Sequence, residues 1–78
     1  TITISGHTDS VGNANSNQQL SKNRADSVGR YLVSKGVNPQ RIQTVGYGDR
    51  NPIASNGNEA GRSKNRRVEI KIHSTKQQ

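Results

Sequence analysis

Two stretches in which hydrophobic and polar residues alternate, and one run rich in β-branched residues, predict three strands. Isoleucine alternates with polar residues over residues 1–5, and valine and isoleucine do so over 68–72. A β-branched run at 41–45 predicts a further strand, which Gly46-Tyr47-Gly48 ends. The side chains expected to face a core are Ile2, Ile4, Val68, Ile70 and Ile72.

Between the first two strands the hydrophobic period lengthens to that of a helix. Leu20, Arg24 and Val28 recur every four residues and so share one face, which Leu32 continues. Arg24 is the only charge on this face. Because a permanent cation at the edge of a core is costly without an anion, we expect Arg24 to meet either Asp9 or an anionic ligand.

Turn and cap residues set the limits of these elements. Asn17 or Ser21 is expected to cap the helix, which runs to about Lys35 and ends at Gly36. The polar residues 7–17 predict an exposed loop, and residues 49–65 predict a long connection. The order strand, helix, strand, strand indicates an α+β fold, in which one sheet and one main helix form a two-layer sandwich.

The 78 residues suffice for one small domain, predicted at residues 1–72 with a flexible polar tail at 73–78. Hydrophobic residues make up 26% of the chain, so the core is thin and composition leaves a disordered chain open as an alternative. The net charge of +7 favours anionic partners. The chain has no cysteine, which excludes disulfides and cysteine-based zinc sites, and no apolar run long enough to span a membrane.

The sequence gives little support to catalysis or metal binding. His7, Asp9 and Ser10 are neighbours on one extended stretch, whereas catalytic triads converge from separate elements. His7 and Asp9 would supply two metal ligands at most, and His73 lies on the tail. We therefore expect a protein that is not an enzyme and that needs no cofactor or metal.

The spacing of several motifs resembles that of the OmpA-like peptidoglycan-binding domain, and the resemblance extends from Ile2 to Ile72. The helix signature matches at Thr8-Asp9, Leu20-Ser21, Arg24-Ala25, Val28 and Leu32. Further matches are Gly36-Val37, Arg41-Ile42, Gly46-Tyr47-Gly48 and Asn65-Arg66-Arg67-Val68-Glu69-Ile70. The resemblance implies a mixed sheet of about three strands, in a β-α-β-α-β fold that lacks its first strand and helix here. The strand at 68–72 would then present a bare edge, which we expect to be paired in a dimer or larger assembly.

The resemblance also implies a function and its residues. It implies non-covalent binding of peptidoglycan through the diaminopimelate of the stem peptide, with Asp9 meeting the ligand's ammonium and Arg24 its carboxylate. We expect the chain to anchor an outer-membrane or envelope protein at the periplasmic face of the outer membrane of a Gram-negative bacterium. Porins, lipoproteins and flagellar stator proteins all carry this module, so the parent protein stays open. Additional candidates for ligand contact are Thr8, Asn17, Leu20, Arg66 and Arg67.

Other interpretations of the same residues remain. Asp9 and Arg24 also suit a structural ion pair that joins the loop to the helix. The basic segment from Arg62 to Arg67 also suits nucleic acid, although the only aromatic side chains for stacking are Tyr31 and Tyr47. The bare edge strand suits a structural role through self-association. Alternation along the last strand places Arg66 and Arg67 on opposite faces, so that one of them approaches the site.

Overall fold

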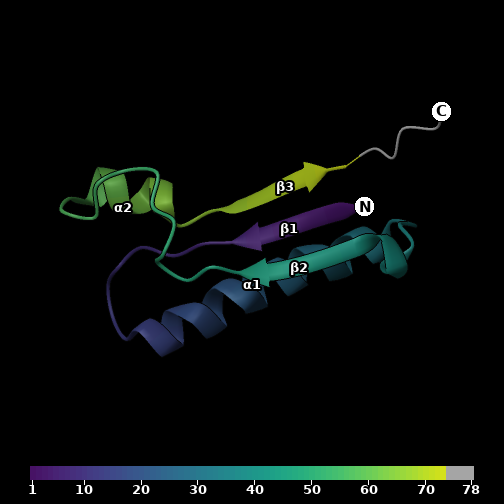
Figure 1. Cartoon of the computed structure of the whole chain (residues 1–78), viewed down its shortest axis with the longest axis horizontal. Coiled ribbons are helices and arrows are strands. Elements are labelled where there is room, and N and C mark those ends of the chain that lie inside the picture. The colour runs from purple at the N-terminus through teal and green to yellow at the C-terminus, as the bar shows by residue number, and fades with distance from the viewer. Residues whose placement is uncertain (74–78) are drawn as a thin grey trace.

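A computed structural model describes residues 1–73 and shows a three-stranded mixed sheet with a long helix against one face (Figure 1). The elements in chain order are β1 (Ile2–Gly6), α1 (Ala14–Ser34), the short 3-10 helix η1 (Pro39–Arg41), β2 (Ile42–Gly46), α2 (Glu59–Asn65) and β3 (Val68–Ile72). β1 lies in the middle, parallel to β2 and antiparallel to β3. The predicted α+β class, strands and main helix are confirmed; most of the predicted tail lies outside the described residues.

The start of α1 differs from the prediction. The helix begins at Ala14 and its cap is Asn13, whose side chain accepts hydrogen bonds from the amides of Asn15 and Ser16. The expectation that Asn17 or Ser21 caps the helix is therefore wrong. The other end agrees, because α1 ends at Ser34 and Gly36 adopts a positive φ of 102°.

The predicted connection over residues 49–65 is wrong in its last part, which forms α2. This helix has seven residues and carries no apolar stripe, so hydrophobic periodicity gives no sign of it. Its cap is Asn58, whose side chain accepts from the amide of Gly61. Local polar contacts, rather than burial of an apolar face, therefore define α2.

The hydrophobic core is small and lies between α1 and the strands β1 and β2. Ile4 and Ala25 are fully buried there. Ile70 pairs with Ile4 across the sheet, yet Ile70 is 51% exposed and Ile72 is 75% exposed. The prediction that these two side chains are buried is wrong: alternation assigns a residue to a face of the sheet, and α1 packs over β1 and β2 rather than over β3.

The helix α1 approaches the sheet closely through two glycines. A Cβ atom on Gly6 would lie 1.9 Å from the carbonyl oxygen of Ser21, and one on Gly46 would lie 2.6 Å from the amide nitrogen of Lys22. Ser21 itself is fully buried, and its hydroxyl accepts from the amide of Gly48 at 2.9 Å and donates to the carbonyl of Gln18 at 2.8 Å. The helix is thus fixed to the ends of both parallel strands.

Thr1 and His73, the first and last described residues, pair at the end of the ladder between β1 and β3. The amide of His73 donates to the carbonyl of Thr1 at 2.8 Å, and the amino group of Thr1 donates to the carbonyl of His73 at 3.1 Å. β3 is an edge strand within the described residues, as expected. Pairing of that edge in a dimer or larger assembly stays a prediction.

We predict that Gly6→Ala lowers the free energy of unfolding by about 3 kcal/mol, since overpacking against backbone allows little relief. The added Cβ atom would meet the carbonyl of Ser21, so strand and helix would have to move apart. Thermal and urea denaturation would measure the loss. Gly57→Ala is the matched control because its Cβ meets only the flexible Ser55 hydroxyl, at 3.2 Å. Equal stability of the Gly6 variant and the wild type would contradict the prediction.

Candidate functional site

Asp9 follows a stretch of backbone that is held on both sides. The amide of Tyr47 donates to the carbonyl of Gly6 at 3.0 Å, and the amide of Thr8 donates to the carbonyl of Gly48 at 2.8 Å. On the other side, the amide of His7 donates to the carbonyl of Arg67 at 2.9 Å. The exit from β1 is therefore fixed between the end of β2 and the start of β3, and so is the backbone that carries Asp9.

The carboxylate of Asp9 has two hydrogen-bond donors and little contact with solvent. Its Oδ2 atom accepts from Nη1 of Arg66 at 2.7 Å, and its Oδ1 atom accepts from the amide of Val11 at 3.1 Å. The side chain is 11% exposed. The hydrogen bond from Arg66, followed by that from Val11, holds the pKa of Asp9 below its usual range, so this side chain is an anion at neutral pH.

Arg24 does not pair with Asp9, contrary to one of our two expectations. Its Nη1 atom donates to the carbonyl oxygen of His7 at 3.4 Å, and no carboxylate of residues 1–73 lies within ion-pair distance of it. The guanidinium is half-buried beside the backbone that leads to Asp9. Arg24 thus keeps its charge without an anionic partner in the described part of the chain.

Arg66 takes the place at Asp9 that Arg24 was expected to fill. Its second terminal nitrogen, Nη2, donates to Oε2 of Glu59 at 2.5 Å, so one guanidinium joins two carboxylates. The hydrogen bonds from Glu59 and then Asp9 raise the pKa of Arg66 above its ordinary value. Arg67 instead pairs with Glu69, with Nε and Oε2 2.6 Å apart. Of these two arginines, Arg66 is the one that contacts Asp9.

Thr8 and Asn17 are buried and shape the loop around Asp9. The hydroxyl of Thr8 donates to the carbonyl of Asp9 at 2.9 Å, and the amide of Asn17 donates to the carbonyls of Asp9 and Val11 at 3.3 and 3.0 Å. The start of the predicted loop is therefore not exposed, since His7, Thr8 and Asp9 are all buried. Leu20, which lies on the predicted apolar face of the helix, is 42% exposed and therefore is not a core residue.

Asn65 supports the site and was missed as a buried residue by the sequence analysis. Its Oδ1 atom accepts from the amides of Ile53 and Ala54 at 2.8 and 3.0 Å. Its Nδ2 atom donates to the carbonyl of Ala54 at 2.9 Å and to the Oδ1 atom of Asn56 at 2.8 Å. The fully buried side chain of Asn65 thereby binds the segment before α2 to the end of α2, directly before Arg66. The sequence marks Asn65 only through its position in the family motif.

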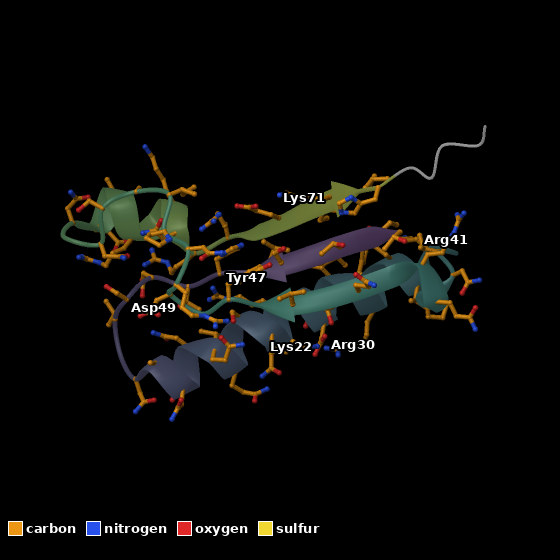
Figure 2. The ribbon with its side chains drawn as sticks, in the orientation of Figure 1. Lys22, Arg30, Arg41, Tyr47, Asp49 and Lys71 are labelled. Atoms are coloured by element: carbon orange, nitrogen blue, oxygen red, sulfur yellow. The ribbon has the colours of Figure 1, made fainter. Side chains whose placement is uncertain are left out.

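His7 is buried and its ring lies against that of Tyr47, the residue after β2 that Figure 2 labels. The two rings stack with their centroids 5.3 Å apart, and neither ring nitrogen of His7 has a hydrogen-bond partner within residues 1–73. Burial, followed by the charge of Arg67, lowers the pKa of His7 below its ordinary value of 6.5, while Glu69 opposes the shift. The imidazole is accordingly neutral at pH 7.

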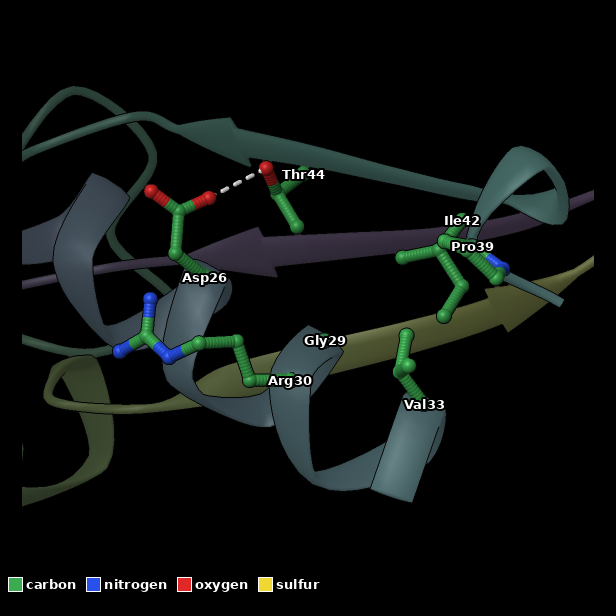
Figure 3. A pocket seen from close by; sticks show the side chains of 7 residues that line it. All are labelled: Asp26, Gly29, Arg30, Val33, Pro39, Ile42 and Thr44. Atoms are coloured by element: carbon green, nitrogen blue, oxygen red, sulfur yellow. Dashed lines mark hydrogen bonds between the residues drawn. The ribbon is translucent and has the colours of Figure 1, made fainter. Parts of the chain in front are cut away.

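Two cavities border α1, and neither is lined by Asp9 or Arg24. One, of about 320 Å³, lies beside Gly48 and Arg50. The other, of about 350 Å³, opens between α1 and the edge strand β2, with Gly29 and Ile42 among its lining residues (Figure 3). Its one carboxylate, Asp26, already accepts from Thr44 at 2.5 Å and pairs with Lys22 at 2.7 Å. The groups around Asp9 therefore form a surface site outside both cavities.

No group of three or more histidine, cysteine, aspartate or glutamate side chains within residues 1–73 is arranged to hold a metal ion. Within the same range, no helix combines the length and hydrophobicity that crossing a bilayer requires.

Comparison with known proteins identifies the family. The OmpA family profile matches residues 1–66, most of the chain. The chain belongs to the OmpA family. The profile match therefore confirms the resemblance that the motifs indicated.

Relatives and solved structures agree with this assignment. The chain is 57% identical over 92% of its length to outer membrane protein A of Bordetella avium, and covers 37% of that protein. It is 51% identical over 92% of its length to the peptidoglycan-binding protein ArfA of Mycobacterium tuberculosis, and covers 22% of it. The fold superimposes on the peptidoglycan-associated lipoprotein of Burkholderia pseudomallei with a TM-score of 0.85 and 35% identity, covering 88% of this chain and 58% of that one. In each case the chain matches well under two thirds of its relative.

We predict that the stability of this domain falls as the pH falls below about 6.5, because His7 is then protonated in the unfolded chain before it is in the folded one. Since the pKa of His7 is lower in the folded than in the unfolded chain, the unfolded state binds the proton first and gains stability on acidification. The loss is at most about 1.4 kcal/mol per pH unit for one proton. Urea denaturation at several pH values from about 5 to 7, where histidine changes its charge, would measure this loss of stability.

His7→Phe supplies the control for this pH dependence, because phenylalanine keeps the ring against Tyr47 and does not titrate. The stability of that variant should vary less over the same range. The lowered pKa values of Asp9 and Glu69 put the carboxylate contributions at lower pH. A wild-type stability that does not change with pH, or an unchanged slope in His7→Phe, would refute the role of His7.

Proposed function

We propose that this chain binds peptidoglycan non-covalently, through the diaminopimelate of the stem peptide, at Asp9 and Arg24. In this proposal the carboxylate of Asp9 meets the ligand's ammonium and the guanidinium of Arg24 meets its carboxylate. A zwitterionic centre requires one anion and one cation close together, and arginine presents a planar fork that matches a carboxylate.

The observation that carries the proposal is the state of Arg24. Its one hydrogen bond within the described residues goes to a neutral carbonyl, that of His7, at 3.4 Å. His7 stands two residues before Asp9, so this cation contacts the backbone that leads directly to an ionised carboxylate. A half-buried guanidinium in this condition favours an anionic ligand. The first turn of α1 has fewer free amides to offer a ligand carboxylate, because Asn13 already accepts from two of them.

The names of the relatives support this assignment. They describe a peptidoglycan-binding protein, a peptidoglycan-associated lipoprotein and an outer membrane protein, and none of these three names denotes an enzyme. By analogy we propose that the chain is a non-enzymatic anchor in the cell envelope, at the periplasmic face of the outer membrane. Whether the parent protein is a porin, a lipoprotein or a stator component depends on regions outside this chain.

The contacts of the basic segment weigh against nucleic-acid binding. Arg62 lies 3.4 Å from Glu59, Arg66 pairs with Asp9 and Glu59, and Arg67 pairs with Glu69. These arginines are neutralised largely within their own chain, so they offer phosphate less charge than the sequence suggests.

We predict that Asp9→Asn and Arg24→Met each weaken binding to insoluble peptidoglycan that contains diaminopimelate. Each substitution removes a charge-assisted hydrogen bond of about 1.5–3 kcal/mol, which corresponds to roughly tenfold to a hundredfold in affinity. Co-sedimentation with purified sacculi would measure the change, and circular dichroism would verify that the variants are folded.

Arg30→Met is the matched control for Arg24→Met, because Arg30 is an exposed arginine on the flank of α1 away from β3 (Figure 2). Its hydrogen-bond partner is the hydroxyl of Ser27. The control should bind as the wild type does. If folded Asp9→Asn and Arg24→Met also bind like the wild type, the proposed site is wrong. Binding to DNA with a steep salt dependence would instead favour the nucleic-acid interpretation.

A further inference from the structure

We propose that Arg66 is a displaceable latch, which occupies the Asp9 oxygen that the ligand's ammonium takes and which Glu59 retains when the ligand binds. This inference rests on the proposed function of Asp9. It assigns roles to Arg66 and Glu59 that neither the family motif nor the expected zwitterion pair contains.

The first step is that the carboxylate of Asp9 has little free capacity. Its Oδ1 atom is held by the amide of Val11, which belongs to the fixed loop, while its Oδ2 atom is held by Arg66. The side chain is only 11% exposed, so solvent reaches a small part of it. An arriving ammonium must therefore compete with Arg66, since the Val11 amide cannot leave without unfolding the loop.

The second step is that Arg66 has somewhere else to go. Its fork is split, with Nη1 on Asp9 and Nη2 on Glu59, so release from Asp9 leaves the second ion pair intact. The side chain of Arg66 is 36% exposed and that of Glu59 is 65% exposed, so Arg66 has room at the surface to move away from Asp9 towards Glu59. Glu59 is also 3.4 Å from the Nε atom of Arg62 in its own helix, so it remains in place to hold the released guanidinium.

The third step concerns selectivity. A simple amine would gain Asp9 but would have to displace Arg66 from it, so Arg66 reduces the net gain from the ammonium. A ligand that also carries a carboxylate gains Arg24, which has no anionic partner among residues 1–73. The latch therefore favours zwitterionic amino-acid centres over amines. A residue that acts in this way is a positioning and specificity residue rather than a direct contact.

Isothermal titration of free meso-diaminopimelate into the wild type, Arg66→Met, Glu59→Gln and the double variant tests the latch. Removing Arg66 frees Asp9, so we expect Arg66→Met to bind roughly three- to tenfold more tightly. Glu59→Gln removes the alternative anion and leaves Arg66 on Asp9, so binding should weaken by a similar factor. In the Arg66→Met background Glu59→Gln should have no effect, because there is no latch left to retain.

Lys64→Met is the matched control, since Lys64 is an exposed cation of α2, the helix that carries Glu59. This variant should bind as the wild type does. If Glu59→Gln changes affinity equally with and without Arg66, its effect is long-range electrostatics and the latch is wrong. Weaker binding by folded Arg66→Met would make Arg66 a ligand contact and would equally overturn it.

The outcome also separates the latch from the proposed function. A wild type that binds no diaminopimelate overturns both. A wild type whose binding depends on Asp9 and Arg24 but shows no coupling between Arg66 and Glu59 overturns the latch alone. Since Glu59 is exposed, Glu59→Gln should fold even if Arg66→Met does not, and unchanged affinity in Glu59→Gln would by itself refute the latch.

Discussion

The direct contact between the backbone of α1 and the ends of β1 and β2 is the constraint on which the site depends. Gly6 and Gly46 have no side chains to separate the layers, and the buried Ser21 hydroxyl binds the amide of Gly48 between them. Arg24 stands three positions after Ser21 on the same helix, and this spacing brings its guanidinium to the carbonyl of His7. A looser packing of helix on sheet would move Arg24 away from Asp9 without changing either residue.

Hydrogen bonds of buried polar groups provide much of the structural support that a hydrophobic core provides in larger domains. Only Ile4 and Ala25 are buried apolar side chains in the described residues, whereas the buried polar ones include Ser21, Asn17 and Asn65. Asn65 uses its whole amide, and Asn17 bridges two carbonyls of the loop. Because each unsatisfied group would cost stability, these contacts also specify one loop conformation. His7 is the exception, since its ring nitrogens have no hydrogen-bond partner within residues 1–73, and its burial favours the neutral form.

Much of the fold follows from hydrophobic periodicity, which located the three strands and the main helix. The same periodicity singled out Arg24, because one cation on an apolar face stands out, and Asp9 followed as the anion just after the preceding strand. It could not find α2, whose seven residues have no apolar stripe. Nor could it tell which asparagine caps α1, since several lie close together. It assigned Ile70 to the correct face but could not say whether anything covers that face.

The partner of Asp9 was beyond sequence reasoning for a different reason. Arg66 lies 57 positions away along the chain, and no local pattern connects residues at that separation. Alternation indicated that either Arg66 or Arg67 approaches the site but could not tell which. The structure shows that Arg66 contacts Asp9, next to Asn65, whose amide is bound to the segment before α2.

The pairing of Thr1 with His73 at the end of the β1–β3 ladder has a consequence for how this domain forms. Thr1 and His73 are 72 positions apart, and the whole ladder between β1 and β3 connects residues nearly as distant. The β1, α1 and β2 unit needs only a shorter loop, so it can assemble before β3 returns. Closure of the long loop then limits the folding rate. Because Arg66 precedes β3, the ion pair at Asp9 forms late, after the helix and Arg24 are already in place.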